Sequence, residues 1–302
     1  MQTNIKLALL GGDARQLSVA KELSVAGFLT ELWGIDKAFC YSPDIGLCDN
    51  WGRVIDGCSA LILPLPASAD GVRVNCPLLN EQAEIKISKV LDLLPKETLI
   101  LGGRFSPSVK QMITDKGFRF LDYFLREELQ IKNAVPTAEG AIAIAMNELS
   151  VTISGASVAI LGYGRIGKIL AEKLKALNAK VTVAARKLTD LAMAQSLGLD
   201  ILPIIINDQE NTLSALSTGY HVIFNTVPSW ILSKDIVKAL DPNTLVIDLA
   251  SAPGGIDITA ANLRGIRVVR ALSLPGKSSP VTAGKIIAQT IVQILKEEGI
   301  AP

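Results

Sequence analysis

The chain has 302 residues, of which 49% are hydrophobic and 20% are charged, and its formal net charge is +1. This length predicts about two domains with sizeable cores, and the near-neutral charge excludes a general attraction to nucleic acid or to an anionic membrane surface. No stretch reaches the roughly 18 uninterrupted apolar residues of a membrane-spanning helix. The amino terminus lacks the basic segment and cleavage site of a secretory leader, so we expect a cytoplasmic protein.

The four cysteines, Cys40, Cys48, Cys58 and Cys76, all lie in the first third of the chain. None of them forms a CxxC pair, and no histidine accompanies them. This pattern predicts free thiols in a reducing compartment and no metal site.

The first third of the sequence alternates between short apolar runs and segments with helical spacing. We expect strands at Ile5–Leu10, Phe28–Ile35, Ala60–Leu63, Thr98–Leu101 and Phe118–Leu121, and helices at Ala14–Ala26, Glu81–Leu94 and Ser108–Lys116. Such alternation predicts a mainly parallel sheet with helices on both faces.

Charged side chains follow two of these strands. The segment Gly11-Gly12-Asp13-Ala14-Arg15 lies between a strand and a helix but lacks the full dinucleotide fingerprint, so we do not expect a second dinucleotide site there. Arg15 and Arg104 are candidate ligands for a substrate carboxylate, because a guanidinium group can form a bidentate pair with it. A surface ion pair is the alternative for each arginine. Asp13 is a candidate proton acceptor.

A segment with helical spacing, Thr137–Leu149, is expected to link the two domains. It is opened by Pro136 and carries Glu139, the second candidate proton acceptor.

The most specific motif is Gly162-x-Gly164-x-x-Gly167, which follows the apolar strand 157–161 and opens a helix at Ile166–Leu177. In a dinucleotide fingerprint the first glycine permits a tight turn, the second lets the backbone approach a pyrophosphate, and the third allows close packing of helix and strand. A second strand at Lys180–Ala184 completes the βαβ unit. The candidate pyrophosphate-binding residues are therefore Gly162, Tyr163, Gly164, Arg165, Ile166 and Gly167.

The residues after the second strand indicate the type of cofactor. An NAD site has a carboxylate there for the ribose 2′-hydroxyl, whereas this chain has Arg186 and Lys187 and no carboxylate before Asp190. Arginine suits a 2′-phosphate. The sequence favours NADP, and the alternative is a solvated basic turn.

Three later strands are expected at Val222–Asn225, Thr244–Asp248 and Arg267–Val269, each followed by small residues or prolines. Ligands in such sheets bind beyond the carboxyl ends of the strands. The candidates near a nicotinamide ring are Thr226, Val227, Pro228 and Ala250. The single histidine, His221, precedes a strand at the opposite end. That position disfavours ordinary 2-hydroxy-acid dehydrogenation, which needs a base beside the nicotinamide.

The last expected helix, about Val281–Glu298, is preceded by Lys277 and Ser278. A helix start flanked by a lysine and hydroxyl groups is a candidate carboxylate site, and a solvated loop charge is the alternative. Together these patterns predict an α/β protein of two Rossmann-like, doubly wound parallel-sheet domains with a cleft between them. We expect a substrate or partner domain at 1–135, joined by the carboxyl-terminal helix 281–302, and an NADP-binding domain at 136–280.

Several segments together resemble the family of A-type dipicolinate synthase subunits: the glycine motif with Arg186, and the segments 9–15, 136–140, 225–228 and 274–280. The resemblance implies a sporulation enzyme of the mother-cell cytoplasm that forms pyridine-2,6-dicarboxylate from a dihydrodipicolinate precursor. It also implies a hetero-oligomer with the flavoprotein-like B-type subunit. The residues leave two alternatives open: a nucleotide-binding scaffold or sensor, and an NADP-linked reductase of another cyclic imine or keto acid.

Overall fold

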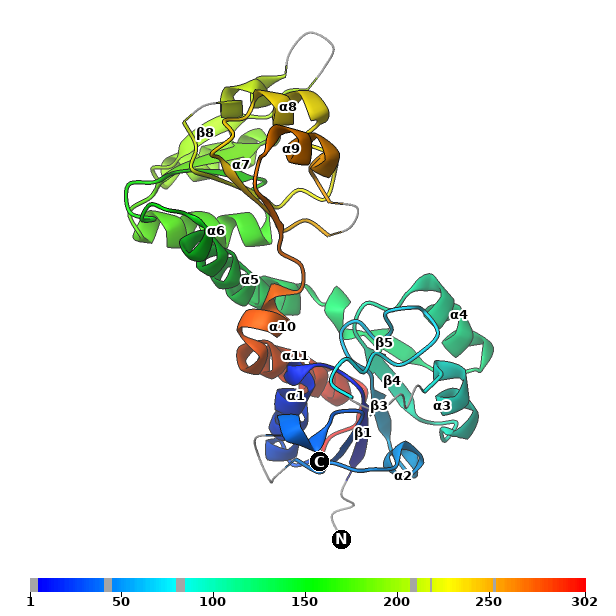
Figure 1. Cartoon of the computed structure of the whole chain (residues 1–302). Coiled ribbons are helices and arrows are strands. Elements are labelled where there is room, and N and C mark those ends of the chain that lie inside the picture. The colour runs from blue at the N-terminus through cyan, green and yellow to red at the C-terminus, as the bar shows by residue number, and fades with distance from the viewer. Residues whose placement is uncertain (1–4, 41–44, 80–84, 207–210, 218, 252–253) are drawn as a thin grey trace. The chain divides into compact units, whose positions relative to one another are not determined.

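The structure, a computed structural model, describes residues 5–40, 45–79, 85–206, 211–217, 219–251 and 254–302 (Figure 1). The chain divides into two compact units. Unit 1 comprises Met1–Asn133 and Pro275–Pro302, and unit 2 comprises Ala134–Leu274.

Unit 1 contains a five-stranded parallel sheet in the order β2-β1-β3-β4-β5. Alternating residues of β1 point to opposite faces of this sheet, so Leu7 and Leu9 join one buried cluster and Ala8 and Leu10 join the other. Helices α1 and α11 cover the first face, and α2, α3 and α4 cover the second. The elements are β1 (Lys6–Leu10), α1 (Ala14–Val25), β2 (Leu29–Trp33), α2 (Trp51–Ile55), β3 (Ala60–Ile62), α3 (Ile87–Leu93), β4 (Leu99–Gly102), α4 (Pro107–Asp115), β5 (Phe120–Asp122) and α11 (Pro280–Glu297).

Unit 2 contains a six-stranded parallel sheet in the order β11-β10-β9-β6-β7-β8, the strand order of a dinucleotide-binding fold. Helices α5, α6 and α7 pack on one face, and α8 and α9 pack on the other (Figure 1). The elements are α5 (Glu127–Glu148), β6 (Ser157–Leu161), α6 (Arg165–Ala176), β7 (Lys180–Ala185), α7 (Leu188–Ser196), β8 (Asp200–Pro203), β9 (Val222–Asn225), α8 (Lys234–Ala239), β10 (Leu245–Asp248), α9 (Ile258–Arg264) and β11 (Val268–Arg270). The predicted fold class, two parallel-sheet α/β units, is confirmed.

The predicted start of the long helix at Pro136 is wrong. Helix α5 begins at Glu127, and Pro136 lies inside it. Proline removes one backbone hydrogen bond there, but burial on both sides of it stabilises the helix: Leu129 packs in the core of unit 1, and Ala138 packs in the core of unit 2. Glu127 and Glu128 in the first turn also favour the earlier start, because carboxylates are stabilised at helix amino termini.

Two other elements differ from the expectation. Residues Leu274–Ser278, expected to be a loop, form the single turn α10. The helix expected at Glu81–Leu94 is described only from Ile87, and residues 80–84 lie outside the described part of the chain. The remaining predicted strands and helices fall within a few residues of the observed bounds.

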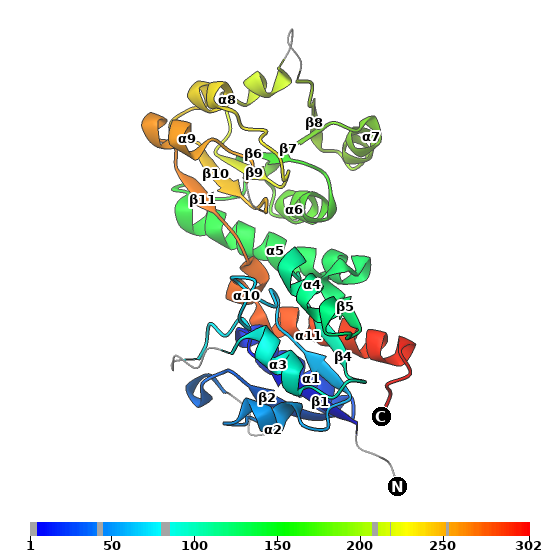
Figure 2. The same cartoon turned by 90° about the vertical axis from the view of Figure 1, so that its right-hand side faces the viewer.

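Helices α1 and α11 lie side by side in both views, which brings the carboxyl-terminal helix into unit 1 (Figure 2). Gly284 of α11 lies close against α1. A Cβ atom there would lie 2.5 Å from the Arg15 carbonyl oxygen and 2.5 Å from Ser18 Cβ. The two helices can therefore pack this closely only because residue 284 has no side chain.

We predict that Gly284→Val lowers the free energy of unfolding of unit 1 by about 1–3 kcal/mol, because the added side chain forces the two helices apart. The measurement is chemical denaturation. Thr282→Val places the same side chain at an exposed position of the same helix and is expected to change stability by less than about 0.5 kcal/mol. Equal stability of the two variants would contradict the packing argument.

Candidate functional site

The turn between β6 and α6 requires glycine at two of its three glycine positions. Gly162 has a φ of +93°, and a Cβ atom on it would lie 2.5 Å from Thr226 Oγ1. A Cβ atom on Gly167 would lie 2.1 Å from the Gly162 carbonyl oxygen. The first glycine therefore makes the turn, and the third lets the helix pack against the strand, as the motif predicts.

Gly164 is different, because a Cβ atom added there would meet no atom within 4 Å. Its φ is −83°, which any residue can adopt. Packing therefore does not require a glycine at this position. What the missing side chain leaves is open space at the amino end of α6, where backbone N–H groups and the helix dipole favour an anion. The turn thus fits a pyrophosphate, with Arg165 and Ile166 supplying backbone in the first helical turn.

A cavity of about 200 Å³ lies beside this turn, at the carboxyl ends of β6, β7 and β9. Arg186 and Lys187 line it and are exposed to solvent. Asp190, in the first turn of α7, also lines it and is half-buried. The other lining residues are Gly162, Tyr163, Ala185, Ile204, Ile206, Val227, Ser229, Trp230 and Ile231. The cavity therefore combines two cationic side chains and an indole ring with the glycine turn.

Tyr163 has a packing role. Its side chain is 4% exposed and belongs to the core cluster under α5 and α6. Burial raises the pKa of its hydroxyl, with smaller contributions from the carboxylates of Asp190 and Glu172. Lys168 Nζ lies 5.7 Å from the ring centroid. Tyr163 therefore contributes its backbone to the turn and its ring to the core.

The loop after β9 closes directly on the glycine turn. Thr226 Oγ1 donates a hydrogen bond of 2.8 Å to the Leu161 carbonyl oxygen. Val227 lies against the cavity, and Pro228 is exposed. The backbone N–H of Ala250, one of the groups expected near a nicotinamide carboxamide, instead donates to Asp248 Oδ1 at 3.2 Å.

Sequence reasoning missed a buried polar cluster at the same edge of the sheet. Asn225, Asp248 and Arg270 are the last residues of β9, β10 and β11, and they lie opposite one another in register. Asn225 and Asp248 are 0% exposed, and Asn225 Nδ2 donates to Asp248 Oδ1 at 2.8 Å. The available signal was a polar residue closing each of three apolar strands.

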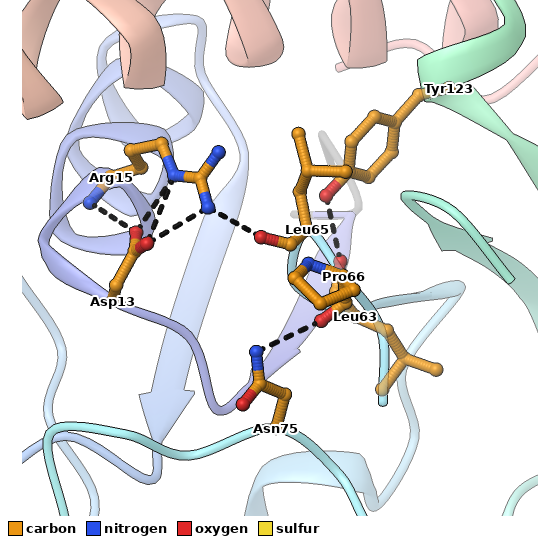
Figure 3. Close-up of polar contacts among 7 residues, drawn as sticks. All are labelled: Asp13, Arg15, Leu63, Leu65, Pro66, Asn75 and Tyr123. Carbon is orange, nitrogen blue, oxygen red and sulfur yellow. Dashed lines mark hydrogen bonds and ion pairs between the residues drawn. The ribbon is translucent and has the colours of Figure 1, made fainter. Parts of the chain in front are cut away.

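In unit 1 the candidates Asp13 and Arg15 form an ion pair with each other (Figure 3). Asp13 caps α1 by accepting from the Arg15 backbone N–H, and its carboxylate also accepts from Arg15 Nε at 2.9 Å and Nη2 at 2.8 Å. Arg15 is 7% exposed and also donates to the Leu65 carbonyl oxygen. The pair therefore has a structural role in addition to any role with substrate.

The same loop after β3 is held at two further carbonyl groups (Figure 3). Asn75 Nδ2 donates to the Pro66 carbonyl oxygen at 3.3 Å, and the Tyr123 hydroxyl donates to the Leu63 carbonyl oxygen at 3.1 Å. Tyr123 is fully buried, and this burial raises the pKa of its hydroxyl above its usual value. The phenol is therefore a hydrogen-bond donor here and stays protonated.

The other predicted anion ligands are exposed. Arg104 has a φ of +52° and follows β4, and its backbone N–H donates to Asp122 Oδ1 at 3.0 Å. Lys277 and Ser278 lie in α10 next to Gly276, where a Cβ atom would be 2.9 Å from Asp13 Oδ2 and 3.0 Å from Arg15 Nε. The structure thus brings the segment 276–278 to the Asp13–Arg15 pair.

Glu139 and His221 lie away from the glycine turn. Glu139 pairs with Lys173 at 2.9 Å, and Lys173 is about two turns, or roughly 12 Å, along α6 from its amino end. His221 precedes β9 at the amino edge of the sheet, and its Nδ1 accepts from the Ser157 backbone N–H at 3.1 Å. His221 therefore lies at the opposite end of the unit 2 sheet from the glycine turn.

None of the four cysteines is in a disulfide. Burial raises the pKa of Cys58 to about 11 and that of Cys76 to about 12, so both are unreactive as nucleophiles near neutral pH. Across the described part of the chain, no helix has the length and apolarity to cross a membrane, and no three His, Cys, Asp or Glu side chains are grouped to hold a metal ion.

Comparison with known proteins identifies the family. The model of the N-terminal domain of the A-type dipicolinate synthase subunit matches residues 6–124. The A-type dipicolinate synthase subunit of Bacillus subtilis (strain 168) is 32% identical over 300 residues, which cover 98% of each chain. The chain belongs to the family of A-type dipicolinate synthase subunits. Its resemblance to that family, expected from the sequence motifs, is confirmed.

Solved structures of the same family agree with this assignment. The A-type dipicolinate synthase subunit from Bacillus halodurans superposes with a TM-score of 0.87 at 31% identity, covering 98% of this chain and 99% of that one. A transhydrogenase from Sinorhizobium meliloti shares the fold, with a TM-score of 0.70 at 12% identity, covering 97% of this chain and 93% of that one. The model of the saccharopine dehydrogenase NADP binding domain matches residues 158–264. Unit 2 therefore carries a nicotinamide-nucleotide site.

We predict that Gly164→Ala leaves the stability of this family member within about 0.5 kcal/mol and weakens dinucleotide binding by at least about tenfold, because the methyl group enters the space left for the pyrophosphate. Binding is measured by calorimetry and stability by thermal unfolding.

Gly167→Ala is the matched comparison. Its methyl group would meet the Gly162 carbonyl oxygen, so it is expected to lower the melting temperature of unit 2. Dinucleotide affinity retained in folded Gly164→Ala would place the pyrophosphate elsewhere.

Proposed function

We propose that the chain is an NADP-dependent oxidoreductase subunit that forms dipicolinate, pyridine-2,6-dicarboxylate, from a dihydrodipicolinate precursor during sporulation. The observation that carries the proposal is the cavity with Arg186 and Lys187 beside the glycine turn, in a chain of the dipicolinate synthase family. Membership of the family suggests the substrate, and the cavity suggests NADP.

The residues of unit 2 are assigned distinct parts in holding the cofactor. Backbone at Gly162–Gly167 binds the pyrophosphate, and Arg186 and Lys187 bind the 2′-phosphate through charge-assisted hydrogen bonds. Asp190 lines the same cavity. Thr226, Val227, Pro228 and Ala250 surround the nicotinamide half.

The substrate has two carboxylates, and unit 1 offers exposed cations for them. Arg104 and Lys277 are exposed, and Ser278 adds a hydroxyl group. The guanidinium of Arg15 is bound on one side by Asp13 and Leu65. We therefore assign that side to holding the β3 loop, and we assign any contact with substrate to the rest of the guanidinium group.

The reaction converts dihydrodipicolinate and NADP⁺ to dipicolinate, NADPH and a proton. When bound, NADP⁺ supplies the hydride acceptor. The chain orients the ring so that the carbon losing hydride faces the cofactor site, which is a contribution of proximity. Asp13 or a water molecule accepts the proton from the neighbouring position. Formation of an aromatic ring drives the reaction, so a finely tuned base such as histidine is not required.

The family name also suggests the assembly. We propose that the chain acts with the B-type dipicolinate synthase subunit in a hetero-oligomer of the mother-cell cytoplasm. A second candidate function is a nucleotide-binding scaffold or sensor whose partner performs the turnover. The observation that favours it is that both candidate proton acceptors are engaged: Asp13 pairs with Arg15, and Glu139 pairs with Lys173.

The decisive experiment follows absorbance near 340 nm after mixing the chain with freshly generated dihydrodipicolinate and NADP⁺, in the presence and absence of the B-type partner. A rise matched mole for mole by dipicolinate supports the dehydrogenase. Turnover only in the presence of that partner shows that it is needed. No rise in a complex that binds NADP favours the sensor or another cyclic substrate.

We predict that Arg186→Asp weakens NADP⁺ binding on the order of 100-fold, because a carboxylate replaces a cation beside the 2′-phosphate. NAD⁺ binding should change by less than about threefold, because NAD⁺ lacks that phosphate. Both dissociation constants are measured by calorimetry. Arg264→Asp, the same charge reversal in α9 outside the cavity lining, is the control. Equal losses for both dinucleotides in Arg186→Asp would remove Arg186 from this role.

A further inference from the structure

The buried cluster at the ends of β9, β10 and β11 is centred on the carboxylate of Asp248. Its Oδ1 accepts from Asn225 Nδ2 at 2.8 Å and from the Ala250 backbone N–H at 3.2 Å. Its Oδ2 accepts from the Gly255 backbone N–H at 3.4 Å and lies 3.9 Å from Arg270 Nε. One carboxylate therefore contacts both neighbouring strands and both ends of the loop that follows its own strand.

Asn225 extends the cluster into the loop after β9. Its Oδ1 accepts from the Val227 backbone N–H at 3.1 Å, and its Nδ2 also donates to the Val227 carbonyl oxygen at 3.3 Å. The backbone N–H of Leu249 donates to the Asn225 carbonyl oxygen at 2.8 Å. The loops after β9 and β10 are thus tied to each other through Asn225 and Asp248.

Gly254 and Gly255, which follow β10, lie close against the cluster. A Cβ atom on Gly254, whose φ is +96°, would lie 2.9 Å from Asp248 Oδ2 and 2.9 Å from Arg270 Nη2. A Cβ atom on Gly255 would lie 2.1 Å from Asn225 Nδ2. The cluster therefore leaves no room for a side chain at either glycine. Its hydrogen bonds hold the backbone after β10 at Ala250 and at Gly255.

Burying a carboxylate to hold a turn costs free energy, because the charge is removed from water and its partners offset that cost only in part. Its position suggests what it does. In a parallel sheet with this strand order, a dinucleotide lies across the point where the order reverses, here between β6 and β9. The adenosine half then lies over β7, where Arg186 is, and the nicotinamide half lies over β9 and β10.

We propose that Asp248 is a positioning residue for the nicotinamide half of the cofactor: it fixes the two loops that contact that half, through Val227 and Ala250. This inference rests on the proposed function. It deepens that function by dividing the site into two parts, because Asp248 acts on the nicotinamide end and leaves the adenosine end unchanged.

The test compares two ligands that share the adenosine half, NADP⁺ and 2′,5′-ADP, by calorimetry on the full chain. Asp248→Asn keeps the shape of the side chain but replaces one acceptor oxygen with an NH2 group, which would face the backbone N–H of Ala250 or of Gly255. We expect NADP⁺ to bind about tenfold more weakly, the scale set by one unsatisfied buried polar group, and 2′,5′-ADP to bind within about twofold of the wild type.

The control is Thr244→Val. Thr244 is 1% exposed, and its Oγ1 donates to the Tyr220 carbonyl oxygen at 2.9 Å at the opposite end of β10. This variant also loses a buried hydrogen bond, but both ligands should keep their wild-type affinities. If Asp248→Asn fails to fold, Asn225→Ala is measured instead, with the same selective loss expected.

The inference is overturned if the substitution weakens both ligands equally, which a merely structural role predicts, or if it weakens neither. In either case, binding of both ligands by the wild type leaves the proposed cofactor site standing. If the wild type binds neither ligand, the cofactor site itself is wrong and the inference falls with it.

Discussion

The approach of Gly167 to the Gly162 carbonyl oxygen is the contact on which the rest of unit 2 depends. A Cβ atom at Gly167 would lie 2.1 Å from that oxygen, so the helix and the strand can meet only without a side chain. This approach sets the amino end of α6 directly beyond β6. Thr226 closes on the same turn by donating to the Leu161 carbonyl oxygen. The open space at Gly164 and the loop after β9 adjoin this turn, and Gly162 itself lines the cavity at Arg186.

Unit 1 has a glycine turn at the equivalent place in its sheet, but there a carboxylate lies at the amino end of the helix where unit 2 has open space. There the first helix is capped by the Asp13 carboxylate, which accepts from the Arg15 backbone N–H and pairs with the Arg15 guanidinium. A carboxylate already occupies the position where a phosphate would bind to the helix dipole. At Gly164 no side chain exists to cap α6. The same strand–turn–helix architecture therefore supports a dinucleotide in one unit and disfavours it in the other.

The sequence was most informative where a local rule determines the structure. The glycine motif and the apolar strands were predicted because tight turns and buried parallel strands restrict the residue types they accept. The start of α5 was not predicted, because burial of Leu129 and Ala138 outweighs the hydrogen bond that Pro136 removes. The hydrogen bond from Arg15 to the Leu65 carbonyl oxygen was not predicted either, because the two residues are far apart in the sequence. Asn225, Asp248 and Arg270 become a cluster only when strand register is known.

The charges along the carboxyl edge of the unit 2 sheet are arranged by strand. Two cations, Arg186 and Lys187, follow β7 and outnumber the Asp190 carboxylate in the same cavity. The buried carboxylate of Asp248 ends β10 on the other side of the glycine turn. Arg270 offsets part of that negative charge, but its Nε is 3.9 Å from the carboxylate and its side chain is 39% exposed. NADP⁺ has matching polarity, since its adenosine end carries an extra phosphate and its nicotinamide ring is cationic. This order of charges supports the proposed orientation of NADP⁺, in which the nicotinamide ring lies over the loops that Asp248 holds.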